Sequence, residues 1–120
     1  MHFEQFWSQS VEFLNERIRG ARENGAELFV IPNWSADGRV RFPVVPIYSA
    51  SRREIVCGLV GNGNREVNVP KSLLKTFYEK CWTAYKTGEL NRGELRDRPD
   101  TQRKTTYLIS LMKFLESYAG

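Results

Sequence analysis

The feature that most constrains the fold is a series of four extended, largely apolar segments between residues 27 and 69, separated only by short turns. Neighbouring parallel strands need a crossover of a dozen or more residues, usually a helix, and this stretch contains none. Short hairpin connections are available, because Asp37-Gly38 and Gly61–Asn64 have the composition of hairpin turns. The sequence therefore predicts an antiparallel sheet of about four strands, made of two hairpins.

Prolines limit where the first two strands can lie. Pro32 falls in the first extended segment, and Pro43 and Pro46 fall in the second, which spans residues 39–48. Proline has no amide hydrogen, so it is tolerated mainly at sheet edges, strand ends and bulges. We expect the first strand to end at Pro32 or to lie at an edge, and the second to be a bent edge strand.

Helical patterns flank the extended stretch on both sides. Apolar residues recur at steps of three and four over residues 3–22, 70–88 and 107–118, which places them on one face of a helix. Helices with one apolar face are expected to bury that face against the sheet. The sequence therefore predicts an α+β fold, in which an N-terminal helix and C-terminal helices pack on the sheet. Residues 1–120 are short enough to form a single domain.

Capping signals subdivide the C-terminal third. Asn91 followed by Glu94 is a capping-box sequence and predicts a short helix over residues 92–97. Asp100 or Thr101 is the expected cap of the last helix, which then begins near residue 101.

Composition and the terminal sequence indicate the environment of the protein. Hydrophobic residues make up 41% of the chain and charged residues 27%, the balance of a folded, water-soluble domain. The chain contains no run of 18 apolar residues, and it begins without the basic and apolar regions of a secretory signal. Cys57 and Cys81 have apolar neighbours and are interpreted as small buried hydrophobes. We therefore expect a reduced, cytoplasmic protein that is not inserted in a membrane.

The positive charge is concentrated in one part of the chain. Residues 1–70 carry eight basic and eight acidic side chains, whereas residues 71–120 carry ten basic and six acidic ones, which accounts for the whole net charge of +4. A basic region beside a neutral one is typical of proteins that bind nucleic acid. It also occurs where charge serves only solubility.

The segment from Lys86 to Phe114 is the leading candidate for such binding. Its three expected helices resemble a helix-turn-helix, whose last helix enters the major groove of DNA. Arginine and glutamine pair with base edges, and lysine and threonine contact phosphates. Phosphate contacts are assigned to Arg92, Arg96, Arg103 and Lys104, and groove-facing roles to Gln102 and Thr105. Neutralising Arg103 and Lys104 is then expected to weaken binding to all sequences and to flatten its salt dependence.

Two acidic residues and a proline oppose this interpretation. Asp97 and Asp100 lie close to where a phosphate would bind, and Pro99 interrupts the connection between the helices. The alternative is that this segment is a solvated, mixed-charge link between two core helices.

A second basic group lies on the predicted hairpins. With Trp34 and Tyr48, it could form a stacking surface for single-stranded nucleic acid if one face of the sheet is open. The alternative is that these arginines protect an exposed edge from aggregation. The group comprises Arg39, Arg41, Arg52, Arg53 and Arg65.

The sequence offers little for catalysis. The single histidine is His2, close to the terminus, so histidine-based acid–base or triad chemistry is not expected. No set of cysteines and histidines has metal-ligand spacing, and no cofactor is expected. A small metal-dependent hydrolase stays open as an alternative, because Asp37, Glu54 and Glu66 lie near the hairpins.

The first helix carries more aromatic surface than one narrow stripe. Phe3, Phe6 and Phe13 extend the apolar face that Trp7 begins. Such a wide apolar face suits packing against a second subunit. The alternative to nucleic-acid binding is therefore a protein-interaction module, or a homodimer that associates through this helix.

One residue pattern in the C-terminal third resembles that of a known group of proteins. It consists of Trp82-x-x-Tyr85-x-x-Gly88, Arg92-x-x-Leu95 and Arg103-x-x-Thr106-Tyr107-Leu-Ile-Ser110. Residues 77–112 resemble the C-terminal part of small uncharacterised proteins carried on mobile gene cassettes, integron cassettes among them, and similar tails occur in DNA-restriction modules. The resemblance implies an association with DNA but no substrate and no catalytic residues.

Overall fold

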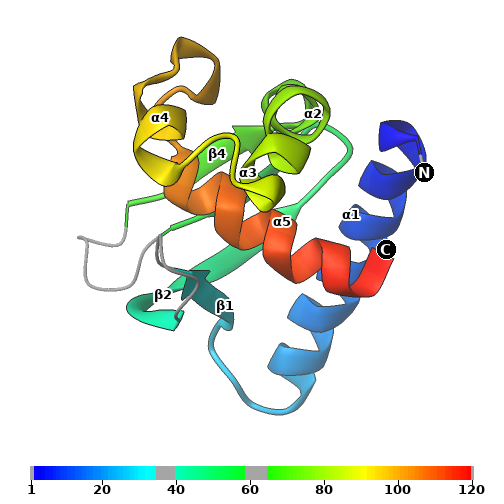
Figure 1. Ribbon diagram of the computed structural model, residues 1–120. Coiled ribbons are helices and arrows are strands. Elements are labelled where there is room, and N and C mark those ends of the chain that lie inside the picture. Colours follow the sequence, from blue (N-terminus) through cyan, green and yellow to red (C-terminus); the bar gives the residue numbers. More distant parts are fainter. Residues whose placement is uncertain (1, 35–39, 59–64, 120) are drawn as a thin grey trace.

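The computed structural model describes residues 2–34, 40–58 and 65–119, which form a four-stranded sheet with helices packed against it (Figure 1). The strands are β1 (Phe29–Trp34), β2 (Val40–Ala50), β3 (Glu54–Cys57) and β4 (Val67–Pro70). The helices are α1 (Phe3–Glu23), α2 (Lys71–Phe77), α3 (Thr83–Thr87), α4 (Arg92–Asp97) and α5 (Thr105–Ala119). The π-helical turn η1 (Tyr78–Trp82) joins α2 to α3, and the 3₁₀ turn η2 (Pro99–Thr101) follows α4.

The sheet is an antiparallel meander with the order β1-β2-β3-β4, so the predicted α+β class and the two hairpins are confirmed. Both predicted hairpin turns, at Asp37-Gly38 and Gly61–Asn64, lie outside the described residues.

The expectation that the second strand lies at an edge is wrong. β2 pairs with β1 on one side and with β3 on the other. It tolerates its prolines because the two partners use different parts of it: the β3 pairs begin at Ile47, beyond Pro43 and Pro46. The β1–β2 pairing is irregular opposite Pro43, where the register shifts. At such a shift a residue is left unpaired, so a proline without an amide hydrogen costs no ladder hydrogen bond there. β1, which contains Pro32, is the edge strand, as expected.

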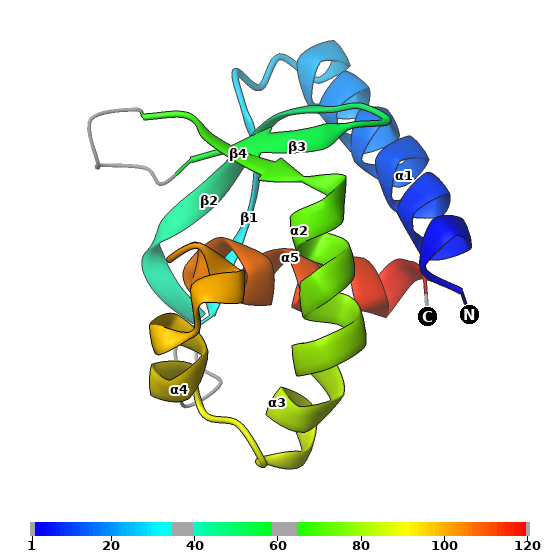
Figure 2. The ribbon, with the colours of Figure 1, turned by 90° about the horizontal axis from the view of Figure 1, so that it is seen from above.

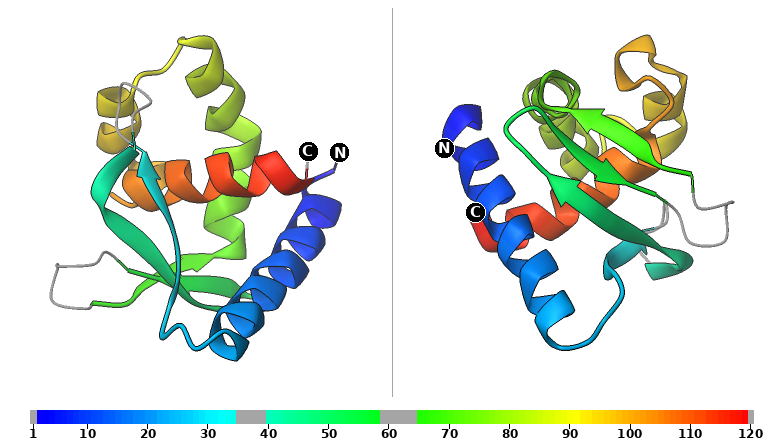
Figure 3. Two further views of the ribbon diagram at one scale, coloured as in Figure 1. Left: turned by 90° about the horizontal axis from the view of Figure 1, so that it is seen from below. Right: turned by 180° about the vertical axis from the view of Figure 1, so that it is seen from behind.

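Helix α5 forms the centre of the hydrophobic core. It crosses one face of the sheet (Figures 1 and 2), and the view from behind shows strands in front of it (Figure 3). Its buried residues lie on nearly every side of the helix, so α5 is enclosed by the rest of the chain. They are Thr105, Leu108, Ile109, Ser110, Leu111, Met112 and Leu115.

The helical segment from Lys71 to Thr87 is continuous. The turn η1 inserts an extra residue into the helix at its middle. The segment ends at Gly88, whose φ of 85° is the left-handed conformation that favours glycine, as the sequence predicts.

The aromatic residues of α1 pack against other parts of the same chain. Phe3, Phe6 and Trp7 are buried, and the ring of Phe13 stacks on that of Tyr118 in α5, with centroids 4.0 Å apart. The N-terminal helix therefore packs on β2 and meets the end of α5 (Figure 2). Within the described residues, no helix combines the length and apolar composition needed to cross a membrane.

Candidate functional site

Helix α4 is fixed by the capping box that the sequence predicts. The Asn91 side-chain oxygen accepts from the Glu94 backbone N–H at 2.8 Å, and the Glu94 carboxylate accepts from the Asn91 N–H at 3.2 Å. The side chain of Leu95, on the inner face of α4, is completely buried. This short helix therefore has a defined position, from which its arginines point to two different depressions on the surface.

The last helix does not begin near residue 101. The Asp100 carboxylate accepts two hydrogen bonds from Arg98, at 2.9 and 2.8 Å, and so does not cap a helix. The Thr101 hydroxyl lies 2.9 Å from the carbonyl oxygens of both Leu95 and Arg98, which closes η2 instead. Gln102 and Arg103 then adopt left-handed φ angles of 52° and 59°, and α5 starts only at Thr105.

The predicted groove-facing residues are therefore not on an exposed helix. Gln102 and Arg103 are exposed in the turn before α5, whereas Thr105 is buried with 5% of its surface accessible. Lys104 is half-buried, and its ammonium donates to the Asn68 carbonyl oxygen at 2.5 Å. A helix-turn-helix contact is ruled out by this arrangement, because α5 belongs to the core and cannot enter a groove.

The two arginines assigned on α4 have different environments. The Arg92 guanidinium donates to the carbonyl oxygen of Trp34 at 3.4 Å and also to the Thr106 hydroxyl, so it ties α4 to β1 and α5. Arg96 is exposed, and its Nε lies 3.5 Å from the carboxylate of its neighbour Asp97. Arg96 and Arg103 are therefore the assigned cations most accessible to a ligand.

These two arginines line one of the depressions, which we name the arginine pocket, with a volume of about 860 Å³. Its walls are Arg96, Asp97, Arg98, Pro99, Gln102 and Arg103. The hydrogen bonds from Arg98 hold the pKa of Asp100 below its ordinary value, so Asp100 stays ionised and offsets part of the Arg98 charge.

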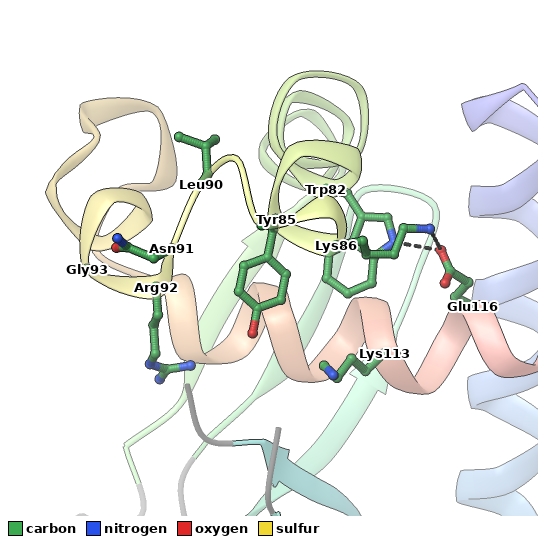
Figure 4. Close-up of a pocket in the computed structure, with 10 residues that line it drawn as sticks. Trp82, Tyr85, Lys86, Leu90, Asn91, Arg92, Gly93, Lys113 and Glu116 are labelled. Atoms are coloured by element: carbon green, nitrogen blue, oxygen red, sulfur yellow. Dashed lines mark hydrogen bonds and ion pairs between the residues drawn. The ribbon is translucent and has the colours of Figure 1, made fainter. Parts of the chain in front are cut away.

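A second depression of about 830 Å³ lies on the other side of α4, between α3, α4 and α5 (Figure 4). We name it the aromatic pocket. Its functional side chains are Trp82, Tyr85, Lys86, Arg92, Lys113 and Glu116. In the close-up, Tyr85 extends from α3 toward α5, and its hydroxyl is directed between Arg92 and Lys113.

One end of the aromatic pocket is closed by a hydrogen-bonded group. Glu116 accepts from the Trp82 indole N–H at 2.6 Å and from the Lys86 ammonium at 2.9 Å. Burial by itself raises the pKa of Glu116, but the hydrogen bonds from Lys86 and Trp82 outweigh it and the pKa is lowered. Glu116 is therefore a carboxylate at neutral pH that balances the charge of Lys86.

Lys113 brings a third positive charge to the lining of the pocket. Its ammonium lies 4.9 Å from the centroid of the Trp34 ring, a cation–π contact. Among the ion pairs formed by the described residues, none involves Lys113. An anion that enters the aromatic pocket thus meets an ammonium group that forms no ion pair with a described carboxylate, although the charge of Lys113 helps to lower the pKa of Glu116.

The charge of the two pockets differs from that of the depression between α1 and α5. Together they are lined by six basic and two acidic side chains, a surplus of four. The depression between α1 and α5 is lined by two acidic side chains, Glu12 and Glu16, and by no basic one. The two pockets beside α4 are therefore lined by more positive charge than the depression between α1 and α5.

The second basic group does not form the predicted stacking surface. The Trp34 ring contacts Lys113 of α5, so it lies on the helix side of the sheet. Tyr48 is half-buried and would contact a side chain placed at Gly58. Arg52, Arg53 and Arg65 are exposed, and the side chains of Arg39 and Arg41 lie outside the described residues.

Catalytic and metal-binding groups do not converge in the described part of the chain. Both cysteines are free and buried, and burial raises the pKa of Cys57 to about 12. The Glu54 carboxylate accepts from the Asn68 amide at 3.1 Å, Glu66 is exposed, and Asp37 is not among the described residues. Within residues 2–34, 40–58 and 65–119, no three potential metal ligands come together.

Sequence reasoning did not identify Tyr85, Lys86 and Lys113 as site residues. Lys86 pairs with a carboxylate thirty residues away, and Lys113 meets an aromatic ring on a strand. The one usable signal is that Lys113 and Glu116 interrupt the apolar pattern of the last helix, three residues apart on one face.

Comparison of the chain with protein-family models, with curated proteins and with solved structures finds no match. The resemblance of residues 77–112 to gene-cassette proteins therefore stays a prediction.

Proposed function

We propose that this protein binds nucleic acid, without catalysis, through the basic surface on both sides of α4. The observation that carries the proposal is the charge of the two pockets, which are lined by six basic and two acidic side chains. A local cationic surface of this kind attracts a phosphate backbone and releases counterions when it binds.

The burial of α5 limits the mode of binding. Because α5 is enclosed by the core, it cannot be placed in a groove. We therefore expect the exposed arginines to contact phosphates and not to read the sequence of a duplex. Arg96 and Arg103 are suited to this role, since both are exposed and lie in the same pocket. Binding is therefore expected to depend on salt far more than on duplex sequence.

The other candidates have less support. The aromatic face of α1 that suggested a homodimer packs against the core of the same chain. That face therefore no longer supports a homodimer. The carboxylates that suggested a hydrolase do not form a described metal site. We therefore propose neither.

The proposal predicts the effect of removing the two exposed arginines. Lys104 is engaged with Asn68, so the informative double variant is Arg96→Gln with Arg103→Gln. We expect affinity for a labelled oligonucleotide to fall about tenfold at low salt, and the slope of log affinity against log salt to decrease by about 1.4, since each contact with a single strand contributes about 0.7. Fluorescence anisotropy measures both quantities.

A matched control is available on α1. Arg19 and Arg22 are exposed at the end of that helix, away from α4, and the double variant Arg19→Gln with Arg22→Gln removes the same two charges. Its affinity is expected to stay within about twofold of the wild type. Equal losses in the two double variants would show that only net charge matters, and would contradict a site around α4.

A further inference from the structure

The aromatic pocket differs from the arginine pocket in having a ring next to its cations. Tyr85 lines the pocket, and the nearly buried Trp82 supports it: the two rings are stacked with centroids 5.7 Å apart and planes inclined by 24°. The Lys86–Glu116 pair and the Lys86 contact on the Trp82 ring fix the other side of Trp82. Tyr85 is thereby packed against a nearly buried ring, as one aromatic wall of the pocket.

The cations lie at the end of Tyr85 where its hydroxyl points. Lys113 comes from α5 and Arg92 from α4, so the tyrosine is flanked by basic groups from two elements (Figure 4). Gly88 and Gly93 also line the pocket, and their lack of side chains leaves its rim open beside α4. A flat ring stacked on Tyr85 would carry any anionic group attached to it toward Lys113.

From this juxtaposition we infer that the aromatic pocket is a subsite for one unpaired nucleotide, whose base stacks on Tyr85 and whose phosphate pairs with Lys113. The inference rests on the proposed function and adds that the protein prefers single strands to duplexes. Bases in a duplex are already stacked and paired, so they cannot enter such a pocket, whereas every base of a single strand offers a free ring face.

The test compares Tyr85→Leu with Tyr85→Phe. Leucine removes the aromatic face, and phenylalanine keeps it. We expect Tyr85→Leu to bind a labelled single-stranded oligonucleotide about tenfold more weakly than the wild type, and Tyr85→Phe to bind within about twofold of it, since one base–aromatic stack has an effect of this size. Binding to a duplex of the same sequence is expected to be equal in all three proteins.

Tyr118→Leu is the matched control, because Tyr118 is 54% exposed and lies at the far end of α5, outside both pockets. It is expected to bind like the wild type. A second measurement needs no variant: a single strand containing 5-bromouracil is irradiated with the wild-type protein and the crosslink is mapped. We expect the crosslink in the tryptic peptide of residues 81–86, which contains Trp82 and Tyr85.

The outcomes separate the two proposals. If single strands bind but Tyr85→Leu binds like the wild type, or crosslinks map only outside residues 81–86, the nucleotide subsite is wrong and the proposed function stands. If neither single strands nor duplexes bind the wild-type protein, the proposed function fails and the subsite fails with it.

Discussion

The free energy of unfolding is expected to fall by about 3 kcal/mol when Leu111 is replaced by alanine, within the 2–5 kcal/mol typical of a buried leucine. Leu111 is fully buried at the middle of α5, where the sheet and the other helices surround it. Truncation leaves a cavity that a close-packed core cannot fill. Urea unfolding followed by tryptophan fluorescence measures the change.

The same experiment tests whether α5 is the centre of the core. Ser117→Ala is the control on the same helix, because Ser117 is exposed and its hydroxyl donates to the nearby Phe114 carbonyl oxygen. We expect this change to alter stability by no more than about 0.5 kcal/mol. If Leu111→Ala were equally mild, α5 would not be the centre of the core, and its exclusion from a DNA groove would lose its basis.

Replacing Trp82 by alanine is expected to lower the free energy of unfolding by about 3–5 kcal/mol, the range for a buried aromatic residue. Trp82 is 4% exposed, its ring packs on Phe77 and Tyr85, and its indole N–H donates to Glu116. The substitution removes the support of the Tyr85 wall together with part of the core. Thermal and urea unfolding report the loss.

Trp82→Phe separates the packing from the hydrogen bond. Phenylalanine keeps an aromatic ring in contact with Tyr85 but has no N–H to donate, so we expect a cost of about 1.5–3 kcal/mol, the range for a hydrogen bond to a charged group. A Trp82→Ala protein as stable as the wild type would mean that this side of the aromatic pocket is not packed as described.

Local signals in the sequence predicted local structure well. The capping box at Asn91 and the glycine at residue 88 act through backbone groups within a few residues, and the structure confirms both. The antiparallel sheet could also be predicted, because the turns between its strands are too short for anything else. The position of β2 inside the sheet could not be predicted, because it depends on which residues of β2 pair with β1 and which pair with β3.

The start of α5 was misjudged because two capping residues have other partners. Asp100 pairs with Arg98, and the Thr101 hydroxyl contacts the Leu95 carbonyl oxygen across the turn. A list of residue types cannot show which of several acceptors a side chain will use. Because α5 begins later than expected, Gln102 and Arg103 lie in the turn before the helix, and Thr105 is buried in its first turn.

The positive charge of the candidate site was predictable, but its arrangement was not. Counting charges located the surplus after residue 70. The pairing of Lys86 with Glu116, and of Lys113 with the Trp34 ring, depends on how α3, α5 and β1 pack together. Because of those contacts, Lys86 forms an ion pair whereas Lys113 contacts an aromatic ring, and a count of charges cannot distinguish the two lysines.

The most direct test of nucleic-acid binding is a titration of a labelled single-stranded oligonucleotide with the wild-type protein, followed by fluorescence anisotropy at about 50 and about 200 mM salt. The account predicts a dissociation constant in the micromolar range or below at the lower salt, and binding at least about tenfold weaker at the higher salt. Absence of binding at the lower salt, or an affinity that does not change with salt, would contradict it.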